Sequence, residues 1–261
     1  MNRITKLFNE KKSGILSVYF TAGYPALDDT RRVLAALQAQ GIDLVEIGIP
    51  FSDPMADGPM IQQSNTQALH NGMSQRLLFE QLKDLRQTIQ IPVILMGYLN
   101  PVMQYGFEAF CRSCIETGVD GLIIPDLPFA DYLADYKDIA DRHDLKIIML
   151  ISPETSEERI RQIDDHTSGF IYMVSSASTT GAQNRFSDTV QDYFQKIRSM
   201  NLKNPQLIGF GISNQETYQM ALKNASGAIV GSKFIELLGA NTAPEKAVEG
   251  LLMALFNPNR V

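Results

Sequence analysis

Two carboxylates, Glu46 and Asp57, stand where general acid–base chemistry could take place. Glu46 lies within residues 44–49, a run whose alternating side chains predict a β-strand. Pro50 and Pro54 prevent the strand from continuing, and Asp57 ends the loop that follows. A carboxylate inside an apolar strand carries a high desolvation cost unless it is paired or used. Glu46 is therefore either a buried ion-pair partner or a functional acid.

Two glycine-rich segments could hold a phosphate group. They read Gly209-Phe-Gly-Ile-Ser213 and Gly227-Ala-Ile-Val-Gly-Ser-Lys233, and each closes a strand-like run. Backbone N–H groups at a helix start bind phosphate, and glycine lets the phosphate approach because no Cβ intervenes. Ordinary turn glycine explains either segment alone, whereas the two together favour a phosphate site. Lys233 either adds charge there or is simply solvated.

Other candidate side chains have simpler explanations. Asp126 lies between prolines and fits a turn former as well as a functional group. Cys111 and Cys114 have the spacing of a redox or half-zinc motif, but residues 107–117 read as an amphipathic helix that ends at Gly118. We therefore expect two thiols packed in the core and no metal site.

The elements that must position these residues are strands alternating with helices. The expected strands are 15–21, 44–49, 92–96, 121–124, 146–151, 170–174, 206–210 and 228–230. The expected helices are 28–40, 74–89, 103–117, 131–142, 156–164, 187–200, 214–224 and 243–256, with extra short helices such as one opening near Ser232. This alternation predicts one α/β domain, residues 1–261, folded as a (β/α)₈ TIM barrel. A doubly wound open sheet is the alternative, but it would usually show an early Gly-x-Gly-x-x-Gly, which the sequence lacks.

The barrel prediction places both carboxylates and both glycine-rich segments at one end, because active residues of such barrels follow the C-terminal ends of strands. A Schiff-base aldolase would need a lysine there, whereas Lys146 begins its strand. A metal-dependent aldolase would need histidines there, and the three histidines fall on helices or a helix–strand junction. Acid–base catalysis on a small phosphate ester, without a cofactor, is what remains.

Composition limits the partners and the location. The net charge is −6, without a basic block, which argues against nucleic acid and anionic membranes as partners. The apolar run after Lys11-Lys12 fits a buried strand better than a signal sequence, and no stretch is long enough to span a bilayer. A cytoplasmic protein is expected.

The chain resembles the α subunits of tryptophan synthase over essentially its whole length. The most specific segment is Glu46-Ile-Gly-Ile-Pro-Phe-Ser-Asp-Pro-Met-Ala-Asp-Gly-Pro59, and the resemblance continues through residues 20–25, 124–128, 180–182, 209–213 and 231–232. The resemblance implies a (β/α)₈ barrel that cleaves indole-3-glycerol phosphate to indole and glyceraldehyde 3-phosphate. It also implies an α₂β₂ assembly, in which a pyridoxal-phosphate β subunit takes the indole and the α subunit has no cofactor of its own.

The same resemblance assigns roles to individual residues. Glu46 would protonate indole C3 and is a candidate base for the glycerol hydroxyl, while Asp57 would hold the indole N–H and stabilise the charge that develops on the ring. The implied phosphate ligands are Gly181, Gly211, Gly231 and Ser232. The implied indole pocket and closing loop comprise Tyr98, Tyr172, Thr180 and Phe210, and the implied β-subunit contacts are Asp53 and Pro54.

The sequence departs from the family pattern in two places. Tyr19 stands where the family usually has Phe, and the loop 175–181 lacks an Arg and a Gly that many members carry. The changed loop motivates an alternative, a non-catalytic barrel that binds the phosphate ester and acts as an allosteric activator of a β partner. A sugar-phosphate isomerase is a third reading, which the proline-rich loop between Glu46 and Asp57 does not suit.

Overall fold

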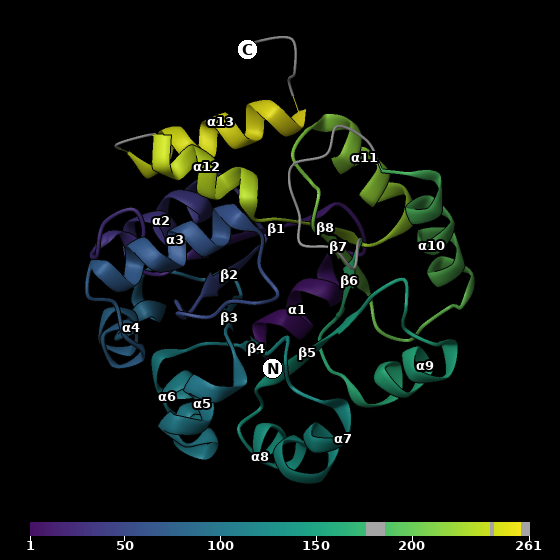
Figure 1. The fold of residues 1–261 in the computed structure, drawn as a ribbon, viewed down its shortest axis with the longest axis horizontal. Coiled ribbons are helices and arrows are strands. Elements are labelled where there is room, and N and C mark those ends of the chain that lie inside the picture. The colour runs from purple at the N-terminus through teal and green to yellow at the C-terminus, as the bar shows by residue number, and fades with distance from the viewer. Residues whose placement is uncertain (176–185, 241–242, 257–261) are drawn as a thin grey trace.

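Eight parallel strands close a barrel in chain order, each paired with its sequence neighbour and β8 paired with β1. The computed structural model describes residues 1–175, 186–240 and 243–256. The strands are β1 (Ile15–Thr21), β2 (Leu44–Gly48), β3 (Val93–Met96), β4 (Gly121–Ile123), β5 (Lys146–Ile151), β6 (Ile171–Val174), β7 (Gln206–Gly209) and β8 (Gly227–Val230). The view in Figure 1 shows the helices arranged around this barrel. The predicted (β/α)₈ barrel is confirmed.

Helices connect consecutive strands, with one helix preceding β1 and two following β8. They are α1 (Arg3–Glu10), α2 (Asp29–Ala39), α3 (Pro59–His70), α4 (Gln75–Leu82), α5 (Leu99–Tyr105), α6 (Phe107–Thr117), α7 (Phe129–Asp131), α8 (Lys137–Arg142), α9 (Glu157–His166), α10 (Asp188–Ser199), α11 (Gln215–Asn224), α12 (Ser232–Ala240) and α13 (Pro244–Phe256). A 3₁₀ turn (Leu85–Gln87) follows α4, and a π-helical segment (Tyr132–Tyr136) joins α7 to α8.

Several helices begin where a side chain caps the first turn. Ser74, Ser156 and Ser187 each accept a hydrogen bond from the backbone N–H three residues later. Asn214 does the same for Thr217 and forms a reciprocal capping box with it. Each cap satisfies an N–H that has no partner within its helix, which explains why the starts of these four helices were predictable from local sequence.

Two predicted helices are broken by residues with positive φ, whereas the predicted helix 131–142 stays helical with a π-helical segment at Tyr132–Tyr136. The segment 74–89 stops as an α-helix at Leu82, and Asp84 takes a left-handed conformation with φ 57° before the 3₁₀ turn. The segment 103–117 is two helices, α5 and α6, which meet at Gly106 with φ 89°. Positive φ values cannot continue a right-handed helix, so the chain changes direction at both positions.

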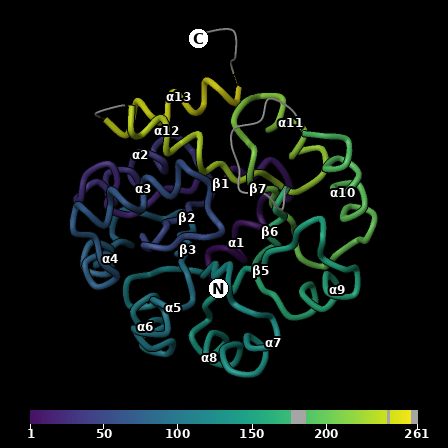
Figure 2. Tube along the Cα trace, viewed as in Figure 1, coloured from purple at the N-terminus to yellow at the C-terminus, as the bar shows by residue number. Residues whose placement is uncertain are grey.

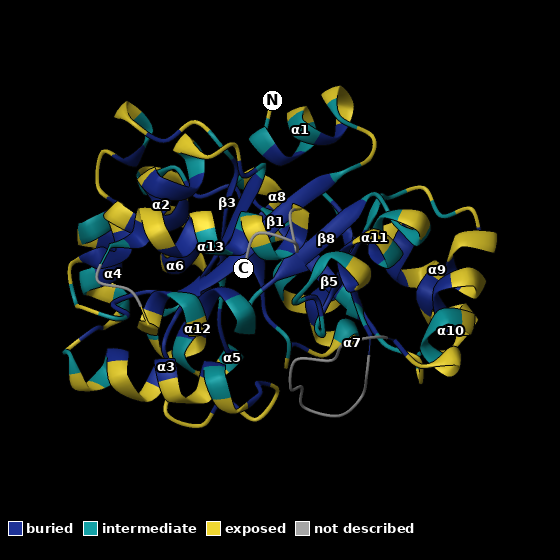
Figure 3. Cartoon of the chain, turned by 90° about the horizontal axis from the view of Figure 1, so that it is seen from above, coloured by how far each residue is buried: buried dark blue, intermediate teal, exposed yellow. Residues whose placement is uncertain are grey.

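Helix α1, which the sequence analysis did not predict, closes the N-terminal end of the barrel. Ile4 and Phe8 are buried in the cluster that fills the barrel interior. The Asn2 amide donates to the backbone oxygens of Asp120 and Asp144, 2.8 Å from each. Figures 1 and 2 show α1 lying across the barrel, and Figure 3 shows it at one end of the buried strands. The other end is therefore the open one.

Alternation along the strands divides their side chains between two apolar clusters. The larger cluster lies between the strands and the surrounding helices. The smaller one fills the barrel and includes Ile15 of β1 and Leu44 of β2. Side chains two residues apart share a face of a strand, so Ser17, Tyr19 and Glu46 also point into the barrel.

Candidate active site

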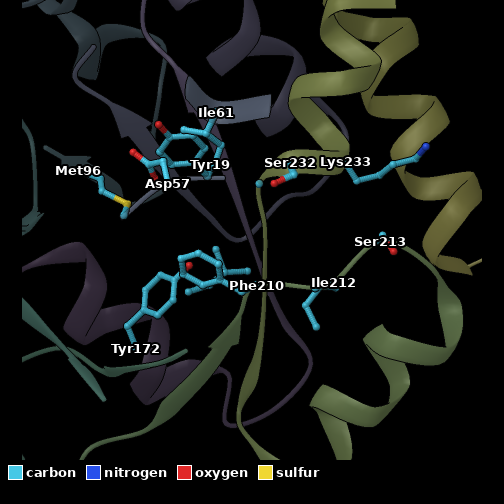
Figure 4. A pocket seen from close by; sticks show the side chains of 13 residues that line it. Tyr19, Asp57, Ile61, Met96, Tyr172, Phe210, Ile212, Ser213, Ser232 and Lys233 are labelled. Atoms are coloured by element: carbon cyan, nitrogen blue, oxygen red, sulfur yellow. The ribbon is translucent and has the colours of Figure 1, made fainter. Parts of the chain in front are cut away.

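A pocket opens at the C-terminal end of the barrel. Its apolar wall is formed by Ile61, Met96, Tyr172, Phe210, Ile212 and Ile229. Tyr19, Asp57, Gly211, Ser213, Gly231, Ser232 and Lys233 complete the lining. In Figure 4 the rings of Tyr172 and Phe210 lie side by side below Asp57 and Tyr19, and Ser232 stands at the start of α12. One side of the pocket thus suits a flat apolar group and the other a polar one.

Glu46 lies beneath this pocket and is not part of its lining. It is fully buried, and its Oε1 accepts a hydrogen bond of 2.8 Å from the Ser17 hydroxyl. Among the described residues, nothing donates a hydrogen bond to Oε2. Burial raises the pKa of Glu46 to about 8, although the Ser17 hydrogen bond acts in the opposite direction. Near neutral pH the side chain is therefore a carboxylic acid that can give up a proton.

The ion-pair explanation for Glu46 does not hold in this structure. None of the ion pairs in the described part of the chain includes Glu46, which contacts a hydroxyl where a cation would be required. A buried, strongly perturbed and unpaired acid next to a pocket is the pattern expected of a functional group.

Asp57 lines the pocket and is held from behind by Tyr98. The Tyr98 hydroxyl donates to Oδ2 of Asp57 at 2.9 Å and accepts from the Ala56 N–H at 3.0 Å. Burial raises the pKa of Asp57 to about 6, and the Tyr98 hydrogen bond opposes that rise. Above pH 6, Asp57 is therefore a carboxylate that can accept an N–H or stabilise a positive charge.

Tyr19 on β1 and Tyr172 on β6 both interact with the two carboxylates. A Cβ at Gly48 would lie 2.0 Å from the Tyr19 hydroxyl, and one at Gly209 would lie 2.2 Å from the Tyr172 hydroxyl. Glycine at these strand ends therefore makes room for both rings. Burial raises the pKa of both tyrosines well above the usual value, with further contributions from Asp57 and Glu46, so both hydroxyls stay protonated.

The polar side of the pocket combines a strained turn with a helix start. Phe210 and Gly211 both have positive φ, 68° and 73°, which is unusual for a residue with a side chain. Gly231 precedes Ser232, the first residue of α12, whose first N–H groups have no carbonyl partner within the helix. Lys233 does not serve the pocket with its charge, because its ammonium group pairs with Glu236 at 3.1 Å.

The predicted site residues fall into three groups. Those lining the pocket are Asp57, Tyr172, Phe210, Gly211, Gly231 and Ser232. Glu46 and Tyr98 stand behind that lining, in contact with Ser17 and Asp57. Thr180 and Gly181 lie outside the described residues.

The two residues predicted to face a partner lie in the loop between β2 and α3. There Asp53 is exposed and Pro54 is buried. Met55, their neighbour, is 85% exposed, the kind of apolar side chain that a partner surface would cover.

Sequence reasoning missed part of the site. Ser17 is not among the residues that the sequence analysis singles out, although its alternation with Ile15 and Tyr19 turns it inward. Met96 and Ile229 carry the same alternation signal, on β3 and β8. For Ile61 on α3 we find no such signal, because the docking of that helix decides which of its residues reach the pocket.

The remaining candidates have structural roles. Asp126 lies in a turn in which the Leu127 N–H donates to the Ile124 carbonyl at 3.1 Å. Its Oδ1 also accepts a hydrogen bond of 2.8 Å from the Leu99 N–H at the start of α5. Cys111 and Cys114 are unpaired and buried in the outer cluster, as predicted, and burial raises the pKa of both thiols.

Within residues 1–175, 186–240 and 243–256, no group of three His, Cys, Asp or Glu side chains could hold a metal ion. No helix in the same ranges is long and apolar enough to cross a membrane.

Comparisons with known proteins agree with this geometry. The family model described as tryptophan synthase alpha chain matches residues 5–257. The tryptophan synthase alpha chain of Parabacteroides distasonis is 69% identical over 255 residues, covering 98% of this chain and 99% of that protein. The crystal structure of tryptophan synthase subunit alpha from Legionella pneumophila has a TM-score of 0.86 at 35% identity, covering 98% of this chain and 97% of that one. Tryptophan synthase from M. tuberculosis, in an aminoacrylate-bound form, has a TM-score of 0.84 at 26% identity, covering 97% and 99%.

Proposed function

Because this chain belongs to the tryptophan synthase alpha chain family, we propose that it cleaves indole-3-glycerol phosphate to indole and glyceraldehyde 3-phosphate with Glu46 and Asp57 as its catalytic carboxylates. The observation that carries this assignment is the buried acid Glu46, whose pKa of about 8 keeps it protonated at neutral pH beneath an apolar pocket. Near neutral pH, protonation of a carbon atom such as indole C3 requires an acid held close to it, and the exclusion of water favours that proton transfer.

The two carboxylates would then act in opposite protonation states. Glu46 gives its proton to indole C3, and the ring becomes positively charged. Asp57, ionised above pH 6, accepts the ring N–H and stabilises that charge. The glycerol hydroxyl next to C3 loses its proton, with Glu46 now available as the base, and becomes an aldehyde. The electrons of the broken carbon–carbon bond return to the ring and regenerate neutral indole.

The two sides of the pocket match the two ends of this substrate. The rings of Tyr172 and Phe210, whose centroids are 6.1 Å apart and inclined at 69°, offer a surface for the indole. The helix start at Ser232, behind Gly231, offers N–H groups to the phosphate. All these groups come from one barrel, which supports a single domain over residues 1–261.

We assign no cofactor to this chain, since the two carboxylates supply the proton transfers that the reaction needs. Pyridoxal phosphate belongs to the β subunit that consumes the indole. The loop in which the buried Pro54 separates the exposed Asp53 and Met55 is our candidate contact with that subunit. A cytoplasmic location is part of the proposal, and the buried free thiols of Cys111 and Cys114 are compatible with a reducing compartment.

Turnover of indole-3-glycerol phosphate, with and without a pyridoxal-phosphate β subunit, tests the proposal. We expect wild type to release glyceraldehyde 3-phosphate, with the rate increased by the partner, and Glu46→Gln to bind substrate but turn it over at least about 100-fold more slowly. Glu80→Gln, the same change at an exposed position of α4, is the matched control. Full turnover by Glu46→Gln would refute the role of Glu46. Binding without cleavage by wild type, alone and with the partner, would instead support the non-catalytic activator.

A further inference from the structure

Ser17 occupies an unusual place inside the barrel. It lies on β1 between Ile15, which belongs to the apolar interior, and Tyr19, which lines the pocket. Tyr19 is the Cα partner of Glu46 on β2, so Ser17 is one inward position below the level of that glutamate. Ser17 is fully buried, as is Glu46. A small hydroxyl side chain thus stands where the neighbouring inward positions of the interior are filled by apolar residues.

The contact between the two side chains is specific. The Ser17 hydroxyl lies 2.8 Å from Oε1 of Glu46, and within the described part of the chain it is the one side chain that donates to this carboxyl group. On the other side of Glu46, the Cα partner on β3 is Ile94, which offers no hydrogen bond. The titratable groups that interact with Glu46 are the hydroxyls of Tyr19 and Tyr172, and both of these also interact with Asp57. No described cation pairs with Glu46, so Ser17 is its main polar neighbour.

This geometry distinguishes the two carboxyl oxygens. A serine hydroxyl has one proton to donate, and Ser17 gives it to Oε1. A carboxylic acid carries its proton on one oxygen, and the other, the carbonyl oxygen, is the stronger hydrogen-bond acceptor, so the hydrogen bond from Ser17 favours Oε1 as the carbonyl oxygen. The acidic proton is therefore placed on Oε2, which has no hydrogen-bond partner among the described residues.

Resting on the function proposed above, we infer that Ser17 is a positioning residue for the cleavage: its hydroxyl fixes Glu46 through Oε1 and leaves Oε2 to exchange the proton with the substrate. The same contact serves both steps. While Glu46 is protonated it holds the side chain in one orientation, and after the proton is transferred it stabilises the carboxylate that forms. Ser17 would not touch the substrate, because it lies one inward position below the level of Glu46, on the side of that carboxyl group away from the pocket.

A purely structural role makes a different prediction. If the hydroxyl only filled space, Ser17→Ala would lower stability and leave the ionisation of Glu46 unchanged. If it positions Glu46, removing it withdraws the hydrogen bond that opposes the effect of burial, and the pKa of Glu46 rises above about 8. A hydrogen bond to a charged group in a buried site corresponds to an upward change of about 1 to 2 pH units.

The first experiment is an infrared titration of the carboxyl C=O band that Glu46→Gln abolishes, in wild type, Ser17→Ala and Ser17→Thr. We expect the midpoint of this band to move upward in Ser17→Ala and to return toward the wild-type value in Ser17→Thr, which keeps a hydroxyl. If Ser17→Ala does not fold, Ser17→Cys replaces it, since a thiol is a weaker donor of similar size. An unchanged midpoint in the hydroxyl-free variant would overturn the inference.

The second experiment is the pH dependence of indole-3-glycerol phosphate turnover. In Ser17→Ala, kcat should fall about tenfold, and KM should change less than about twofold. The basic limb of the pH profile of kcat should move to higher pH. Thr167→Val is the control, because it removes a buried hydroxyl that donates to the Ile147 carbonyl at 2.8 Å near the opposite end of the barrel. Thr167→Val should lower the free energy of unfolding without moving the basic limb of the kcat profile. Failure of wild type to cleave the substrate would refute the proposed function, whereas the infrared titration would still decide whether Ser17 controls Glu46.

Discussion

Replacing Glu46 by Gln should slow turnover at least about 100-fold and yet stabilise the protein at alkaline pH. The folded chain holds the Glu46 carboxyl in full burial, where its pKa is raised from 4.5 to about 8. Between these two values the folded protein keeps a proton that the unfolded chain has released. The folded state therefore binds more protons, and the free energy of unfolding falls as the pH rises through this interval. Glutamine is neutral at every pH and does not lose stability in this way.

The magnitude follows from the two pKa values. Their difference, about 8 minus 4.5, corresponds to about 5 kcal/mol over the whole interval at about 1.4 kcal/mol per pH unit. From pH 5 to pH 8, the part that is easily measured, the expected loss is about 3 kcal/mol. Asp57, with a pKa of about 6, titrates in the same direction in both proteins, so its contribution cancels in the comparison.

Urea denaturation of wild type and Glu46→Gln at pH 5, 6, 7 and 8 measures this difference directly. We expect similar free energies of unfolding at pH 5 and an advantage of about 3 kcal/mol for the variant at pH 8. Glu80→Gln on the exposed side of α4 should show no such pH dependence relative to wild type. A difference between Glu46→Gln and wild type that stays constant from pH 5 to pH 8 would refute the reasoning, since it would mean that burial does not hold the proton on Glu46.

Three further perturbations test other contacts. Tyr98→Phe removes the donor to Asp57, so the pKa of Asp57 should rise above about 6 and the acidic limb of kcat/KM should move upward; an unmoved limb would exclude Tyr98 as the group that tunes Asp57. Ile4→Ala should lower the free energy of unfolding in urea by about 2 to 5 kcal/mol with turnover per folded molecule retained, because Ile4 closes the end of the barrel away from the pocket. Asp120→Asn leaves the partly buried Arg86 without its charged partner and should lower the free energy of unfolding in urea by about 3 kcal/mol. A loss below about 1 kcal/mol would show that water solvates the guanidinium group in place of the carboxylate.

Much of the barrel was readable from local sequence. Short apolar runs located every strand to within one residue at each end, and β1 and β5 have the predicted limits. Capping serines and an asparagine marked the starts of four helices, and the break at Gly106 could have been read from its glycine. These features depend on residues that are neighbours in the chain, so the chain order contains them. The prediction that Glu46 and the glycine-rich segments lie toward the same end of the barrel also follows from the direction of the parallel strands alone.

The contacts that set the chemistry belong to the tertiary structure. Ser17 and Glu46 are 29 residues apart, and Asp57 and Tyr98 are 41 apart, so no local pattern pairs them. The sequence shows a carboxylate within an apolar strand and cannot say whether a cation, a hydroxyl or nothing will face it. That depends on the register between β1 and β2, which places Tyr19 opposite Glu46 and turns the Ser17 hydroxyl toward Oε1. The sequence thus determined which acids and glycines share the open end of the barrel. Tertiary packing decided which of these acids are buried away from water and left Oε2 of Glu46 without a hydrogen-bond donor among the described residues. The reason is that desolvation and hydrogen bonding depend on residues that are distant in the chain.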